Sequence, residues 1–219
     1  MTSIIKTMNN FTVEAPYPQP EALPDYKHIN RYWDKLHKAY AAKILPGEYY
    51  VTLHAELVTT VLGSCISACI RDVKLGIGGM NHFMLPHSNE QSSWGDSSSA
   101  ARYGSYAMEV LINDILKNGG RRENLEVKLF GGGQVLAQKT DVGNKNITFV
   151  REYLKSEGLH LTSEDLGGTY PRKVLFFPDS GRVRMKKLKT LANKTIAKRE
   201  HNYQESLDHP PASPSVELF

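Results

Sequence analysis

The spacing of apolar residues changes near residue 48, and the change divides the sequence into parts. Residues 1–24 are rich in proline and have no periodic apolar pattern, so we expect a flexible arm there. After Asp25, which suits an N-cap, apolar residues recur at steps of four, three and four. This spacing predicts a helical extension over residues 25–47, with an apolar stripe of Ile29, Trp33, Leu36 and Tyr40.

From Glu48 onward, short runs rich in β-branched and aromatic residues predict strands. We expect these strands at 49–53, 57–62, 66–71, 77–85, 125–130 and 160–166, and a hairpin from 172–177 and 182–188. Longer stretches with helical spacing predict helices over 99–117 and 144–157. So many adjacent strands exclude a regular βαβ series, and residues 48–189 therefore predict one mixed α/β domain.

Two further segments have no predicted strand or helix. Residues 87–99 are polar and rich in serine, which favours a surface loop. Residues 190–219 begin with a basic stretch and end in HPPASPSVELF, so we expect a basic and then disordered tail.

Composition excludes several classes of protein. The chain has 219 residues, of which 40% are hydrophobic and 23% charged, as in an ordinary globular domain with extensions. No apolar run approaches the roughly 18–20 residues of a membrane span, and the N-terminus lacks a signal-peptide pattern, so we expect no membrane insertion. Two cysteines exclude a disulfide scaffold and favour a reducing, cytoplasmic setting.

Cys65 is the best candidate for chemistry. It follows a predicted strand and the glycine of Leu62-Gly63-Ser64-Cys65, where a chain reversal can expose a thiol beside free backbone N–H groups. A thiol needs a base at neutral pH, and His82 stands 17 residues later on the predicted returning strand. Two antiparallel strands would bring the pair together for acyl-transfer chemistry. The alternative is that Cys65 is only a small buried hydrophobic residue.

Cys69 suggests two other interpretations, a disulfide and a zinc site. On a strand its Cα would lie about 13 Å from that of Cys65, too far for a disulfide, so we predict a packing role. The spacing Cys65-x3-Cys69-x12-His82-x4-His87 also matches a two-Cys, two-His zinc finger. Pro86 separates the histidines and the segment between the cysteines is apolar, so we predict no metal site.

A glycine run and a basic segment each allow two interpretations. Gly131-Gly132-Gly133 lacks both phosphate-binding fingerprints, which favours a tight turn or a close backbone approach. The segment 182–199 is basic and contains no acidic residue, which suits either an acidic partner or a solvated hairpin edge. No aromatic residue interrupts it, so base stacking is unsupported, and we expect no nucleic-acid binding.

Several segments match a known family as whole motifs. They are VTTVLGSCISACIRD, GIGGMNHFMLP, ARYGSYAMEVLINDILKNGG, LFGGGQVL, DVGNKNITFVREYLKSEGL and SEDLGGTYPRKVLFFPDSGRV. Their combination resembles the CheD family of bacterial chemotaxis proteins, which are chemoreceptor glutamine deamidases. The resemblance covers about residues 49–188 and gives no information about the N- and C-terminal extensions.

The resemblance implies a fold and a set of site residues. The fold is α+β, with a three-layer arrangement shared with bacterial toxin deamidases. The family's catalytic cysteine and histidine fall on Cys65 and His82. Its threonine falls on Thr59, although Thr60 stands beside it and only one of the two can face His82 if 57–62 is a strand. The residues around this set are candidates for the oxyanion turn, Gly63 and Ser64, and for substrate contacts, Asn81 and His87.

The resemblance also implies a reaction and partners. The reaction is hydrolysis of glutamine side chains to glutamate on the cytoplasmic helical region of chemotaxis receptors, through a thioester and without a metal or organic cofactor. A phosphatase of the CheC type is a second implied partner. An adaptor with little catalysis, and a broader amidase or protease, are the alternatives.

Overall fold

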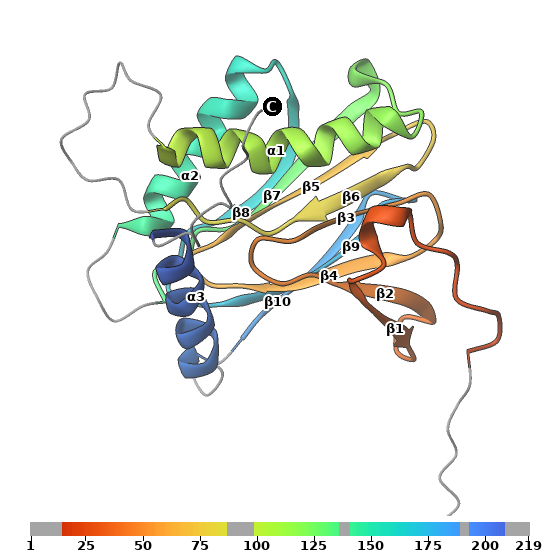
Figure 1. The fold of residues 1–219 in the computed structure, drawn as a ribbon, viewed down its shortest axis with the longest axis horizontal. Coiled ribbons are helices and arrows are strands. Elements are labelled where there is room, and N and C mark those ends of the chain that lie inside the picture. Colours follow the sequence, from red (N-terminus) through yellow and green to blue (C-terminus); the bar gives the residue numbers. More distant parts are fainter. Residues whose placement is uncertain (1–14, 87–98, 136–140, 189–192, 209–219) are drawn as a thin grey trace, which may run out of the picture.

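The computed structural model describes residues 15–86, 99–135, 141–188 and 193–208, which form three layers (Figure 1). An outer sheet has the strand order β1-β2-β4-β9-β10, and a middle sheet has the order β3-β6-β5-β7-β8. Helices α1 and α2 cover the face of the middle sheet that points away from the outer sheet (Figure 1). This α+β arrangement confirms the predicted fold class.

The elements follow one another in a simple order. They are η1 (Pro24–Tyr26), β1 (Asn30–Asp34), β2 (Ala39–Lys43), β3 (Tyr49–Thr52), β4 (Leu57–Leu62), β5 (Ile66–Asp72), β6 (Gly78–Asn81), α1 (Ser99–Lys117), η2 (Arg122–Asn124), β7 (Leu125–Gly131), α2 (Val142–Ser156), β8 (His160–Leu166), β9 (Arg172–Phe177), β10 (Arg182–Lys187) and α3 (Asn193–Asp208). Every strand predicted after residue 48, and both predicted helices, are confirmed within a few residues. The predicted loop over 87–99 lies outside the described residues except at Ser99, where α1 begins.

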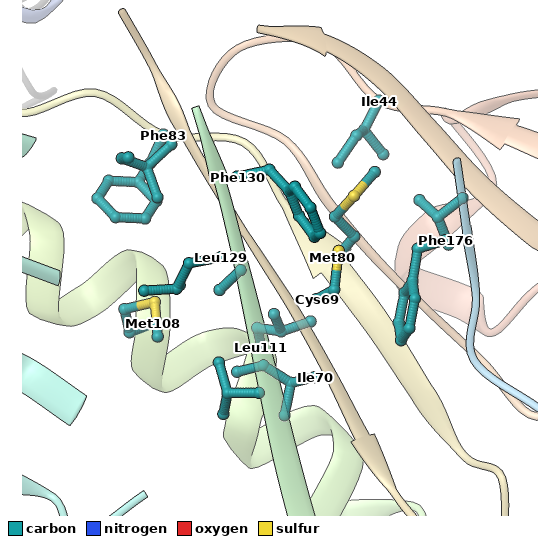
Figure 2. Close-up of a cluster of buried hydrophobic side chains, with 14 of the residues drawn as sticks. Ile44, Cys69, Ile70, Met80, Phe83, Met108, Leu111, Leu129, Phe130 and Phe176 are labelled. Atoms are coloured by element: carbon teal, nitrogen blue, oxygen red, sulfur yellow. The ribbon is translucent and has the colours of Figure 1, made fainter. Parts of the chain in front are cut away.

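The hydrophobic core lies on both faces of the middle sheet. β5 is buried along its whole length except at Arg71, as expected for a strand covered on both sides. Figure 2 shows core side chains from both faces, with Cys69 next to Met80, its partner across the β5–β6 pair. Cys69 is 1% exposed and belongs to this core, which confirms its predicted packing role, and both cysteines are free. None of the helices in the described ranges combines the length and apolar character needed to cross a membrane.

The predicted helix over 25–47 is wrong, because this segment forms the hairpin β1–β2. Trp33 and Tyr40 pair directly across the two strands, with ring centroids 5.2 Å apart. A hairpin with a short turn places residues i and i+7 side by side, which imitates a helical stripe. β2 then pairs in parallel with β4, so these residues belong to the outer sheet of the α+β domain and are not a separate helical extension.

Two residues of the supposed stripe give a test of this correction. Ile29 is 5% exposed and packs in the main core, whereas Leu36 is 83% exposed at the hairpin turn. We expect Ile29→Ala to lower the free energy of unfolding by about 2–4 kcal/mol, and Leu36→Ala to change it by less than about 0.5 kcal/mol. Urea unfolding measures both, and equal losses would favour the helical stripe instead.

The expected tail over residues 190–219 is corrected in part, because it contains a helix. Residues 193–208 form α3, which packs beside the loop between β4 and β5 through Glu200 and has buried side chains at Ile196, Glu200 and Gln204. These residues recur every four positions, which is one face of a helix. Residues 209–219 lie outside the described residues. The basic segment begins on β10, the edge strand of the outer sheet, in agreement with the hairpin-edge interpretation.

Candidate active site

Residues 63–65 form a reversal between a strand of the outer sheet and a strand of the middle sheet. The glycine run after β7 packs against this reversal: Gly132 N–H donates to Cys65 O at 2.8 Å, and Gly133 N–H donates to Gly63 O at 2.7 Å. Gly131 has a φ of +120°, and a Cβ there would lie 2.0 Å from Cys65 O. The run therefore makes the close backbone approach that the sequence predicted.

Asn146 holds the remaining carbonyl of the reversal. It lies on the buried face of α2, donates from Nδ2 to Ser64 O at 2.9 Å and accepts from Leu85 N–H at 2.9 Å. Each of the three carbonyls of residues 63–65 thus accepts a hydrogen bond from the glycine run or from Asn146. Sequence reasoning missed this residue, which is fully buried in the structure. The available signal was its position four residues before Val150, on the apolar face of the helix. A polar residue at such a position signals a buried hydrogen bond.

The three N–H groups of the same residues converge on a single acceptor, the carboxylate of Glu200 from α3. Gly63 N–H and Cys65 N–H donate to Oε1 at 2.7 and 3.3 Å, and Ser64 N–H donates to Oε2 at 2.8 Å. The Ser64 hydroxyl adds a fourth hydrogen bond, to Oε2 at 2.7 Å. An array of backbone N–H groups around one anion is the arrangement that stabilises an oxyanion.

His82 lies immediately after β6, and Thr60 from β4 fixes its ring. His82 Nδ1 is 2.7 Å from Thr60 Oγ1, and the Thr60 hydroxyl donates to Ile44 O at 2.8 Å. Because that hydroxyl has only one hydrogen, its oxygen must accept from Nδ1–H of His82. The second ring nitrogen, Nε2, then carries the lone pair, and it is buried without a hydrogen-bond partner among the described residues. Such a nitrogen can take a proton.

The threonine expected to orient the histidine is corrected by one position. Thr59 points to the opposite face of β4, where its hydroxyl donates to Val174 O at 2.9 Å. Alternate residues of a strand face opposite sides, so only Thr60 reaches His82. The sequence had limited the choice to these two residues.

The thiol of Cys65, the ring of His82 and the carboxylate of Glu200 meet at one point. One reactive atom from each lies within 4.8 Å of the others, and all three residues are buried. Burial, the nearby Glu200 charge and a hydrogen bond to Glu200 raise the pKa of Cys65 well above its ordinary value. Burial, with a smaller effect of the Arg199 charge, lowers the pKa of His82 to about 3. At neutral pH the pair is therefore an uncharged thiol and imidazole while Glu200 is in place.

The same three side chains are of the types that bind Zn²⁺. Zinc ligands lie about 2.0–2.3 Å from the ion, and a ligating carboxylate oxygen needs a free lone pair directed at it. Both oxygens of Glu200 already accept two hydrogen bonds each from residues 63–65. The hydrogen bonding thus favours an anion site beside a nucleophile and a base. Cys69, the second cysteine of the zinc-finger spacing, is not part of this group and lies beside Met80 in the core (Figure 2).

The two expected substrate contacts have different outcomes. Asn81 accepts from Ala68 N–H at 2.8 Å and donates to Ala107 O at 2.8 Å, so its amide joins the middle sheet to α1. Asn81 also lines, with its backbone neighbours His82 and Phe83, a cavity of about 200 Å³ beside Tyr103. These bonds give Asn81 a structural role, and its contact with substrate stays a prediction. His87 lies outside the described residues.

Comparison with known proteins adds the family context. The family model described as "CheD chemotactic sensory transduction" matches residues 84–187. A relative from Halorhodospira halophila, named "Probable chemoreceptor glutamine deamidase CheD", is 57% identical over 203 residues, covering 91% of this chain and 94% of its own. A relative of the same name from Hahella chejuensis is 51% identical over 210 residues, covering 96% and 100%. Since it covers 96% of this chain, this match extends into both residues 1–48 and residues 190–219.

Proposed function

The chain belongs to the CheD family, and we propose that it is a cytoplasmic chemoreceptor glutamine deamidase with Cys65 as its nucleophile. The observation that carries the proposal is that three kinds of chemical group needed for the reaction lie together. A thiol, a histidine with a free nitrogen and three backbone N–H groups surround one carboxylate, and that carboxylate belongs to a glutamate side chain. Glutamate is the product of glutamine deamidation.

The proposed reaction has two halves. In the first, His82 Nε2 takes the Cys65 proton and the sulfur attacks the side-chain amide carbon of glutamine. The oxygen gains negative charge and lies among the N–H groups of residues 63–65. His82 then gives its proton to the leaving nitrogen, so ammonia departs and a thioester forms. In the second half, His82 activates a water molecule, which hydrolyses the thioester to glutamate and restores the thiol.

Thr60 acts in this scheme as a positioning residue. By accepting from Nδ1–H it keeps the proton on the ring nitrogen that faces away from the reaction and leaves Nε2 free. The third member of a catalytic triad has the same task. No step requires a metal ion or an organic cofactor.

The substrate proposed here is a glutamine of the cytoplasmic region of a chemotaxis receptor, in agreement with the names of the relatives. A phosphatase of the CheC type as a second partner is also part of the proposal, and nucleic acid is not. The alternative of an adaptor without catalysis needs no free lone pair at His82 Nε2 and no array of N–H donors. It gives no reason for the geometry of residues 63–65.

Mass spectrometry of a receptor fragment tests the proposal. Incubation of the glutamine-containing cytoplasmic fragment with the protein should raise its mass by one dalton per modified site, release one ammonia for each, and leave the receptor chain whole. An adaptor would bind the fragment without any change of mass. A protease would produce shorter fragments, and either result would contradict the proposed function.

A further inference from the structure

Glu200 occupies the place that the reaction product would occupy. Hydrolysis converts a substrate glutamine to a glutamate whose carboxylate remains between the thiol and the N–H groups of residues 63–65. Glu200 presents the identical side chain at that position, with both oxygens fully hydrogen-bonded. Gly63 permits the approach, since a Cβ there would lie 2.7 Å from Glu200 Oε2.

We propose that α3 is a built-in product analogue: Glu200 fills the subsite for the reacting side chain, and α3 competes with the substrate for the active site. The inference rests on the deamidase function proposed above and adds to it a form of regulation. It also describes the shape of the substrate, because Glu200 reaches the site from a helix. The substrate glutamine is then one that projects from a helix lying where α3 lies.

The contacts on either side of Glu200 show how such a helix is held. Tyr203, one turn later, hydrogen-bonds through its hydroxyl to that of Tyr103 on α1. Gln204 Nε2 donates to Leu85 O at 3.4 Å, and Ile196, one turn before Glu200, is buried. The turn that contains Glu200 and the turn that follows it are thus bound across the edge of the active site. A substrate helix would use the same surface, so the two cannot be bound at once.

The electrostatics of the closed site agree with an inhibited state. The Glu200 charge beside the sulfur disfavours the thiolate that attack on an amide requires, and it adds to the effect of burial on the pKa of Cys65. Cys65 is also 0% exposed, so no external substrate reaches it while α3 is bound. Departure of α3 would remove the charge and uncover the thiol together.

A single substitution tests whether position 200 is the reacting subsite. Glu200→Gln turns the product analogue into an intramolecular substrate, and Cys65 should attack its amide, release ammonia and return it to glutamate through hydrolysis of the thioester. Peptide mass spectrometry of the full chain should therefore find mostly glutamate at residue 200. Glu205→Gln is the matched control, because Glu205 lies on the same helix and is exposed; it should retain its glutamine.

The same variants separate failure of this inference from failure of the proposed function. Conversion at residue 200 that disappears in the double variant Glu200→Gln with Cys65→Ala supports the inference. If glutamine persists at residue 200 while the same preparation deamidates a receptor fragment, α3 is not a product analogue and the inference is overturned. If neither residue 200 nor the receptor is converted, the deamidase function itself fails, and the inference with it.

Alkylation of Cys65 provides a second measurement that needs no turnover. Glu200→Ala removes every hydrogen bond between α3 and residues 63–65, so the fraction of open chains should rise. We expect iodoacetamide to label Cys65 at least roughly tenfold faster than in the wild type, with Cys69 unchanged and Glu205→Ala without effect. An unchanged rate at Cys65 would show that Glu200 does not hold the site closed and would contradict the inference.

Discussion

Replacement of Cys65 by alanine should lower the rate of receptor deamidation by at least about 10⁴-fold, because no other group in the site can form the thioester. His82 and the N–H groups of residues 63–65 would still bind and polarise the amide, but they have no nucleophile to assist. Ammonia release from a receptor fragment under single-turnover conditions measures the loss.

Cys69→Ala is the matched control for this variant. Both cysteines are free and buried, and both changes remove one sulfur atom. Cys69 packs beside Met80 in the core (Figure 2) and is not part of the group formed by Cys65, His82 and Glu200. Its replacement should therefore cost about 1–2 kcal/mol of stability and leave at least half of the activity. A Cys65→Ala protein that retains wild-type activity, or a Cys69→Ala protein that folds and is inactive, would contradict the mechanism.

Local pattern and topology made Cys65 and His82 candidates, and the resemblance to the family selected them as the catalytic pair. Cys65 stands directly before β5, and His82 stands directly after β6. The turn at Asp72 makes these two strands an antiparallel pair, and such a pair brings the start of one strand beside the end of the next. The resemblance placed the histidine's partner at Thr59 with Thr60 beside it, and the alternation of residues along β4 allowed only one of the two to face His82.

The N-terminal hairpin could not be predicted in the same way. The Ile29–Tyr40 region has a spacing that suits both a helix and a two-stranded hairpin, since Trp33 and Tyr40 share a face in either. The pairing of β2 with another strand decides between the helix and the hairpin. Its buried residues Ala41 and Ala42 pair in parallel with Leu57 and Val58 of β4. Tertiary pairing thus overrides the local periodicity.

The role of α3 was hidden for a different reason. The face of α3 that meets the site contains Glu200 and Gln204, two side chains that a hydrophobic pattern counts as exposed. Their burial depends on partners contributed by the reversal at residues 63–65 and by Leu85, more than a hundred residues earlier. One signal of a helix remained: Ile196, Glu200 and Gln204 recur every four positions. They stand in a segment that the sequence analysis interpreted as a basic tail.

Replacement of Thr60 by valine should lower receptor deamidation by about 10²-fold. Valine has nearly the same shape but no hydroxyl, so nothing accepts from Nδ1–H of His82 and the ring is free to rotate or to change tautomer. Ile44 O also loses its donor, and we expect a loss of about 1–3 kcal/mol in the free energy of unfolding. Initial rates with a receptor fragment, together with urea unfolding, measure the two effects separately.

Thr59→Val separates positioning from stability. This variant removes an equally buried hydrogen bond, from Thr59 to Val174 O, and should therefore destabilise the protein by a similar amount. Its activity should stay within about twofold of the wild type, because its side chain faces away from His82. Thr60→Ser restores a hydroxyl and should recover most of the lost rate. If Thr59→Val and Thr60→Val lose activity equally, or if serine at position 60 gives no recovery, the hydroxyl affects the site only through packing, and Thr60 does not position His82.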